Sequence, residues 1–463
     1  MERFCEGLKL MSAPYGRGRT SVYGVRAGHA AITGRGGPHF ARRGPSAVPL
    51  LGCCALAILV LYACIAGLRS CANSRRNAGQ GSGTAAATAP QGSVAAAPEP
   101  SLLVPSAEQY AASPVIKNVR VVIQPADGSA PARGGAVELR ADVGAKLRLL
   151  VQCAAPGDPN ANIYYCAARE AYWSTARIPS GRLGLWPERE FGPLNIRWYK
   201  IEPERDNYSN WRNNQFSFAR INYRKTPVLD WANQWSVGAD VSPTTYEDRL
   251  PGYGTMRYCV EVLRANPNGE TEKPCFSIGP ESATTVSGID VSVPRLSLRR
   301  DDTYIGWLFA WGNVPYVSGS ESPRLDRSHH QAELFQGADC ADLLTAAARK
   351  LGIKDLAYGS TYDIERNART IFSDIDPGAD GVYTVKGQPV KWGNEGVLPG
   401  DVLLYGEHSG ALVSDEPGEG HGVLDLGDTV LHGYDATPCL STVGDAWETH
   451  TITVVRWPLN MEP

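Results

Sequence analysis

The segment 337–352, GADCADLLTAAARKLG, constrains the C-terminal part of the chain most strongly, because it predicts a helix with a cysteine in its first turn. Asp339 is expected to cap the helix, and leucine and alanine recur after it at helical spacing to form one apolar face. Gly352 suits the residue just beyond the helix end. Cys340 therefore lies where N–H groups are unpaired and the helix dipole is positive, which lowers the pKa of a thiol. The alternative is a buried cysteine that packs as a small hydrophobic residue.

Strand-like runs follow the predicted helix, and two histidines accompany them. The runs are DVLLY (401–405), SGALVS (409–414, directly after His408), TVLHGY (429–434, with His432) and the alternating stretch 449–457. A helix followed by a meander of strands is typical of an α+β domain. If consecutive strands pair, His408 and His432 meet on one face of a sheet. A cysteine facing them would have a base in His408, and His432 would hold that base in the productive tautomer.

Three blocks in this segment resemble motifs of the NlpC-type cell-wall endopeptidases, which are papain-like cysteine hydrolases. The similar blocks are NVPYVSGS (313–320) for the proline–tyrosine motif, DCADL (339–343) for the nucleophile motif, and LPGD (398–401) with HSGAL (408–412) for the base motif. His432 fits the place of the family's third polar residue. The resemblance covers about residues 301–463 and implies a papain-like α+β domain, which we expect over 300–463.

The resemblance also implies an active site and a reaction. Cys340 would attack an amide carbonyl, His408 would remove the thiol proton and later protonate the leaving amine, and His432 would orient His408. The residues expected around the oxyanion and the substrate are Tyr316, Asp339 and Ser409. The implied substrate is the stem peptide of peptidoglycan or another cell-surface acyl group. The expected reaction uses no cofactor and no metal.

The sequence departs from the family pattern at three places, which weakens the inference about substrate. Asp342 stands where the family has glycine, and insertions occupy 321–335 and 416–428. Two alternatives remain open: a papain-like transferase or deamidase with the same site, and a surface-binding protein whose hydrolase domain is degenerate. In the second alternative, aromatic residues in loops of the middle domain would bind the ligand. These residues are Tyr164, Tyr165, Tyr172, Trp173, Trp211, Trp231 and Trp235.

The N-terminal part predicts a membrane anchor between two unfolded segments. Residues 48–68 carry no charge and form a run long enough to cross a ~30 Å hydrocarbon core as a helix. Residues 1–47, rich in glycine and arginine, predict a disordered basic cytoplasmic tail, and residues 69–113 a flexible Ala/Gly/Pro/Ser linker. We therefore expect a single-pass protein of the bacterial inner membrane with periplasmic C-terminal domains. A formal net charge of −3 gives no support for a nucleic-acid partner.

Residues 114–294 predict an all-β sandwich, because apolar residues alternate in several runs that are separated by turns. The order Cys153, Trp198, Cys259 resembles that of an immunoglobulin-like domain. Cys259, however, lies on the polar face of its run, which disfavours a core disulfide to Cys153. The expected fold class is therefore multi-domain: a transmembrane helix, an all-β sandwich and an α+β domain.

Hairpin symmetry favours local disulfides instead. The cysteines that flank predicted turns are Cys153 with Cys166 and Cys259 with Cys275. Directly opposed residues on antiparallel strands come close enough for a bridge, so we predict both disulfides and an oxidising compartment. Cys439 remains on a predicted loop, either as an inert thiol or as a redox partner of Cys340.

Overall fold

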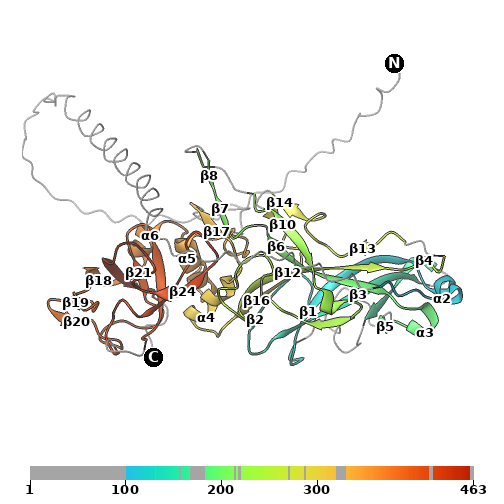
Figure 1. Ribbon diagram of the computed structural model, residues 1–463, viewed down its shortest axis with the longest axis horizontal. Coiled ribbons are helices and arrows are strands. Elements are labelled where there is room, and N and C mark those ends of the chain that lie inside the picture. Colours follow the sequence, from blue (N-terminus) through green and yellow to red (C-terminus); the bar gives the residue numbers. More distant parts are fainter. Residues whose placement is uncertain are drawn as a thin grey trace, which may run out of the picture. The chain divides into compact units, whose positions relative to one another are not determined.

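The computed structural model describes residues 101–130, 132–155, 158–166, 183–212, 215–216, 220–268, 272–285, 288–319, 330–416 and 421–458. All of them belong to one compact unit, Ala96–Pro463. Strands account for 40% of the described residues and helices for 13%. Figure 1 shows two groups of sheets, one from the blue-to-green middle of the chain and one from its orange-to-red C-terminal part.

The expected fold class and localisation are both corrected by this description. The fold class, with its transmembrane helix, is wrong because the described chain is mostly β-sheet. The inner-membrane localisation is wrong as well, because no described helix is long and apolar enough to span a membrane. The longest described helix has 11 residues, whereas a span needs about 20. The segments 1–47 and 48–68, and most of 69–113, lie outside the described residues.

The middle part of the chain forms two sheets that face each other across a common core (Figure 1). Their strands are β1 Ile116–Pro125, β2 Ala136–Arg140, β3 Ala145–Ala155, β4 Asp158–Cys166, β5 Leu183–Leu185, β6 Asn195–Pro203, β10 Tyr223–Pro227, β11 Ser236–Gly238, β12 Gly254–Leu263, β13 Cys275–Phe276 and β16 Arg295–Arg299. One sheet has the order β1-β3-β4-β5, with β11 also paired to β3. The other has the order β10-β6-β12-β16-β2, with β13 also paired to β12.

Strand alternation decides which side chains fill this core. Leu149 and Val151 of β3 point into it and pack with Trp198 and Tyr258 from the facing sheet. Burying each such side chain contributes about 1.5–3 kcal/mol. Cys259, next to Tyr258, lies on the other face of β12 in a separate cluster, which confirms that it does not face the common core.

The two predicted disulfides, Cys153–Cys166 and Cys259–Cys275, are wrong, because all four thiols are free. Cys166 lies opposite Leu150, and Cys275 lies opposite Val262. Each predicted pair is therefore three residues out of register (150 against 153, 262 against 259). Symmetry about a turn-like sequence did not give the register, because each hairpin is centred one to two residues away from the assumed centre.

The C-terminal part is built on one antiparallel six-stranded sheet. Its strands are β18 Arg369–Ile375, β21 Val402–Leu404, β22 Ser409–Ser414, β23 Thr429–His432, β24 Cys439–Thr442 and β25 Ile452–Arg456, in the order β18-β25-β21-β22-β23-β24. Helices α4 (Tyr304–Leu308) and α5 (Cys340–Lys350) cover one face of this sheet through a shared apolar core. The other face carries a second apolar core, formed by residues of the strands and of the segments between them.

The predicted helix is confirmed as α5. Asp339 caps it, since its carboxylate accepts the N–H of Asp342 at 2.9 Å. The helix ends at Lys350, and Gly352 follows with φ of 107°, a left-handed conformation that favours glycine. The N–H groups of Gly352 and Ile353 close the last turn by bonding to carbonyls inside the helix.

Short elements complete the described chain and join its two parts. They are α2 Ala107–Ala112, α3 Glu188–Phe191, α6 Thr361–Asn367, η3 Leu229–Trp231, η4 Phe309–Trp311, β7 Asn207–Ser209, β8 Trp211–Arg212, β9 Gln215–Phe216, β14 Thr284–Thr285, β15 Gly288–Ile289, β17 Tyr316–Ser318, β19 Thr384–Val385 and β20 Gln388–Pro389. Strand β17 pairs in parallel with β7. Buried Arg257 donates to the carbonyls of Leu334 at 2.9 Å and Phe335 at 3.1 Å. These contacts hold the segment that leads into Cys340 against the middle sheets.

Candidate active site

The two predicted histidines meet at the end of strands β22 and β23. His408 directly precedes β22, and His432 ends β23, opposite Gly410. His408 Nε2 and His432 Nδ1 are 2.9 Å apart, a hydrogen-bonding distance. The prediction that consecutive strands bring these histidines together is therefore confirmed.

The histidine pair lies on the face of the sheet that α5 does not cover. Gly410, opposite His432, is also opposite Leu403, and Leu403 belongs to the second apolar core. The ring of His408 stacks on Trp447, with ring centres 4.8 Å apart and planes 22° from parallel. Both imidazoles are buried.

Cys340 lies on the opposite face, and the predicted contact between Cys340 and His408 is not formed. Ser409 is opposite Leu404, whose side chain belongs to the core under α5. Because successive residues of a strand point to opposite faces, Ser409 faces the helix and His408 does not. Cys340 accordingly lies close enough to Ser409 for this residue to influence its pKa. Among the described residues, no hydrogen bond joins the Cys340 thiol to either histidine.

The surroundings of Cys340 keep its thiol protonated. Burial raises the pKa of Cys340 to about 12, and the nearby Asp339 adds to this effect, while the bonds with Ser409 oppose it. The expectation of a lowered pKa at a helix start is therefore wrong, because loss of solvent outweighs the helix dipole here. Tyr316 lies close enough to interact with Cys340, and burial raises its pKa too.

A second thiol lies beside the histidine pair on the other face. Cys439 is the first residue of β24 and lies directly opposite His432. Its Sγ is 3.7 Å from His432 Nε2, and the Oγ of Ser441 is 3.0 Å from the same nitrogen. Cys439 is half-buried. The prediction that it lies on a loop is wrong, and its thiol, like that of Cys340, is free.

The signal for this contact was present in the sequence. His432 and Cys439 flank GYDATP (433–438), so a hairpin about that turn opposes the two residues. Cys439 and Ser441 are two positions apart and therefore lie on one face of their strand. Hairpin pairing applied at this turn would have placed both side chains beside His432.

Both histidines are neutral at neutral pH. Burial lowers the pKa of His408 to about 3, with a smaller effect from His432. Burial lowers the pKa of His432 to about 4, and Arg249 of the middle part of the chain adds to this effect. Burial raises the pKa of Cys439, and Arg249 partly offsets the rise. The three groups therefore start as a thiol and two neutral imidazoles.

Tyr434 links the two faces at this end of the sheet. Its ring centre is 5.4 Å from that of His408 and 6.0 Å from that of Tyr316. The neighbouring Asp435 accepts a hydrogen bond from Asn207 of β7 at 3.3 Å. Since Tyr434 is exposed, the histidine pair lies close to the surface here although its rings are buried.

The aromatic surface that the binding alternative requires finds little support in the described residues. No group of three or more His, Cys, Asp or Glu side chains there is arranged to hold a metal ion. Tyr164 and Tyr165 are buried, and Trp231 and Trp235 pack against the core of the middle sheets, as expected for residues that cover a core. Tyr172, Trp173 and the Trp211 side chain lie outside the described residues.

The site thus places a thiol and two imidazoles within reach of one another, in the order Cys439, His432, His408. A half-buried thiol beside a neutral imidazole is suited to nucleophilic attack with general-base assistance. Comparison of this chain with known protein families, with characterised proteins and with solved structures gives no match.

Proposed function

We propose that the C-terminal domain hydrolyses amide bonds with Cys439 as nucleophile, His432 as general base and His408 as the residue that orients the base. One observation carries this proposal. Two contacts connect the three side chains one after the other. The first joins Cys439 Sγ to His432 Nε2 at 3.7 Å, and the second joins His432 Nδ1 to His408 Nε2 at 2.9 Å. This is the relation of nucleophile, base and orienting group that thiol and hydroxyl hydrolases need.

The reaction begins with transfer of the Cys439 proton to His432 Nε2 as the sulfur attacks the amide carbon. The S–C bond forms, the carbonyl oxygen becomes an oxyanion, and the tetrahedral intermediate then loses the amine. The leaving nitrogen takes the proton from His432 as the C–N bond breaks. Water, activated by the same imidazole, hydrolyses the thioester and restores the thiol.

His408 supports this cycle by selecting the tautomer of His432. For Nε2 to accept a proton, Nδ1 must carry the hydrogen and donate it to His408 Nε2. His408 is held for this role by its stacking on Trp447. Because both histidines are neutral, the Cys439 thiol loses its proton to His432 as it attacks. No thiolate–imidazolium pair forms before the substrate reacts.

The substrate class that we propose is peptide, in the first place the stem peptides of peptidoglycan. The support for it is the resemblance of the blocks around Tyr316, Cys340 and His408 to cell-wall endopeptidase motifs. A transferase or deamidase would use the same three residues and differ only in the acceptor of the acyl group.

A second candidate keeps Cys340 as the nucleophile. It is favoured by the capped helix start and by the proximity of Tyr316 and Ser409 to the thiol. For this candidate the His408 side chain would have to move from its own face of the sheet to the α5 face, past strand β22. The first candidate requires no such movement.

The test is peptide hydrolysis by the full chain and two matched cysteine variants. Muropeptides would be incubated with wild type, Cys439→Ala and Cys340→Ala, and the fragments identified by mass spectrometry. We expect loss of hydrolysis in Cys439→Ala and near-normal hydrolysis in Cys340→Ala. The reverse result would establish the second candidate, and no cleavage by the wild type would exclude this substrate class.

A further inference from the structure

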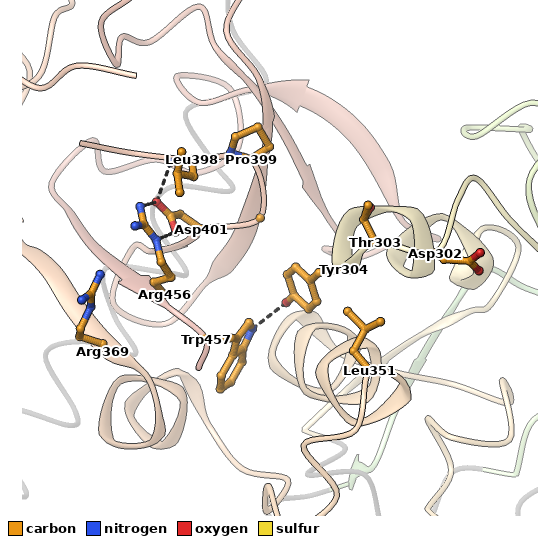
Figure 2. A pocket seen from close by; sticks show the side chains of 11 residues that line it. Asp302, Thr303, Tyr304, Leu351, Arg369, Leu398, Pro399, Asp401, Arg456 and Trp457 are labelled. Atoms are coloured by element: carbon orange, nitrogen blue, oxygen red, sulfur yellow. Dashed lines mark hydrogen bonds and ion pairs between the residues drawn. The ribbon is translucent and has the colours of Figure 1, made fainter. Parts of the chain in front are cut away.

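A cavity of about 510 Å³ lies away from both thiols, between the start of α4, the end of α5 and the end of β25. Figure 2 shows side chains from these elements around it. Ligand-binding cavities commonly measure about 300–1,000 Å³ and combine apolar walls with a few polar groups. Apolar and polar side chains both line this cavity. Its two arginines differ in whether they form an ion pair with another described residue.

Asp401 and Arg456 form a completed ion pair in the cavity wall. Arg456 Nε and Nη2 donate to the two carboxylate oxygens of Asp401 at 2.6 and 2.7 Å. The N–H of Leu398 donates to the same carboxylate at 2.8 Å, and Arg456 also donates to the carbonyl of Gly396 at 2.9 Å. The Asp401 side chain is only 1% exposed, so this pair is part of the fold.

Arg369 presents a second guanidinium at the same cavity, and among the described residues this one has no ion-pair partner. It lies directly opposite Arg456 on the neighbouring strand, an arrangement that places two like charges side by side. Asp401 neutralises Arg456, whereas Arg369 is exposed and forms no ion pair with any described residue. Figure 2 shows Arg369 beside Arg456, with Trp457 between the arginines and Tyr304.

The remaining wall is apolar to a ligand because its polar atoms are engaged. Trp457 Nε1 donates to the hydroxyl of Tyr304 at 2.9 Å, and that hydroxyl donates to the carbonyl of Leu344 at 3.2 Å. Leu351 and Pro399 extend the apolar lining. A molecule in the cavity would therefore meet mainly hydrocarbon surface, with the guanidinium of Arg369 at its edge.

We propose that this cavity binds a small organic carboxylate, with the carboxylate on Arg369 and the apolar body against Leu351 and Pro399. A single guanidinium matches a carboxylate through two parallel hydrogen bonds. A phosphate or a polyanion would need more donors than the single guanidinium of Arg369 supplies. A neutral apolar molecule would leave Arg369 unused.

The test compares two probes of the same shape, phenylacetate and phenylacetamide, titrated into the full chain by calorimetry. Only the first carries a negative charge. We expect phenylacetate to bind about tenfold more tightly than phenylacetamide. Arg369→Gln should remove this preference, and Arg369→Lys should retain part of it.

Lys354→Gln serves as the matched control, because it removes a nearby exposed positive charge that does not line the cavity. It should leave both affinities unchanged. Arg369 is exposed, so its variants should keep the wild-type unfolding midpoint, which thermal unfolding would check. Equal affinity for the two probes, no binding of phenylacetate, or an unchanged preference in Arg369→Gln would each overturn the proposal.

Discussion

The two faces of the C-terminal sheet each carry a cysteine, and the two thiols meet different chemistry. Cys340 begins a capped helix, yet it is buried and lies beside a serine. Cys439 begins an edge strand, is half-buried and lies 3.7 Å from an imidazole. A helix start supplies a partial positive charge, whereas an imidazole supplies a base. A base within hydrogen-bonding reach of a thiol is therefore a more direct indication of a nucleophile than the position of the thiol at a helix start.

The difference between the surroundings of the two thiols arises from which residue at the start of β22 faces α5. His408 and Ser409 are adjacent in sequence, so one of them must face α5 and the other must face away. The structure turns Ser409 toward Cys340 and His408 toward His432. A shift of one residue in β22 would exchange them.

The largest expected effect comes from removing the base. His432→Ala should lower the rate of amide hydrolysis by a factor of about 10²–10⁴, the usual contribution of general-base assistance. His421→Ala is the control, because that imidazole is exposed and pairs with Asp415 rather than with a thiol. Steady-state rates at saturating peptide would measure the effect. Equal rates for the two variants would show that His432 is not the base.

A second prediction compares the cores under the two faces. Leu431 packs under α5, and Leu412 packs on the face of the histidine pair; both are fully buried. Each Leu→Ala change should lower the free energy of unfolding by about 2–5 kcal/mol, measured in urea. Only Leu412→Ala should also slow hydrolysis, because it loosens the face that holds the base. Slower hydrolysis in Leu431→Ala alone would place the chemistry on the Cys340 face.

A third prediction concerns pH. Burial holds the folded pKa near 3 for His408 and near 4 for His432, whereas both histidines would protonate near pH 6.5 in the unfolded chain. Below about pH 6.5 the unfolded state therefore binds protons that the folded state does not bind. The stability that depends on neutral histidines is complete above that pH and is lost as the pH falls toward 4 and then 3.

Urea unfolding of wild type and His432→Gln over this range would measure the effect, since glutamine does not titrate. The fall in unfolding free energy on acidification should be smaller in the variant. An equally steep fall in both proteins would mean that His432 is not buried in the neutral form.

Local sequence was sufficient to predict some of these features and insufficient to predict others. The capping Asp339 and the apolar spacing after it predicted α5, because both depend on contacts within one helix. The meeting of His408 and His432 followed from the order of the strands. The face of Ser409 could not be derived, because it depends on the register of β22 against β21, which long-range packing decides. The disulfides failed for the same reason.

The central claim is that Cys439, and not Cys340, is the nucleophile. The most direct measurement uses p-nitrophenyl acetate, an activated acyl donor that does not depend on the natural peptide. The full chain would be mixed with it, quenched in acid and digested, and the acetylated cysteine identified by mass spectrometry. The account predicts a thioacetate on Cys439 that is lost in His432→Gln. A thioacetate on Cys340 that persists in His432→Gln would contradict it.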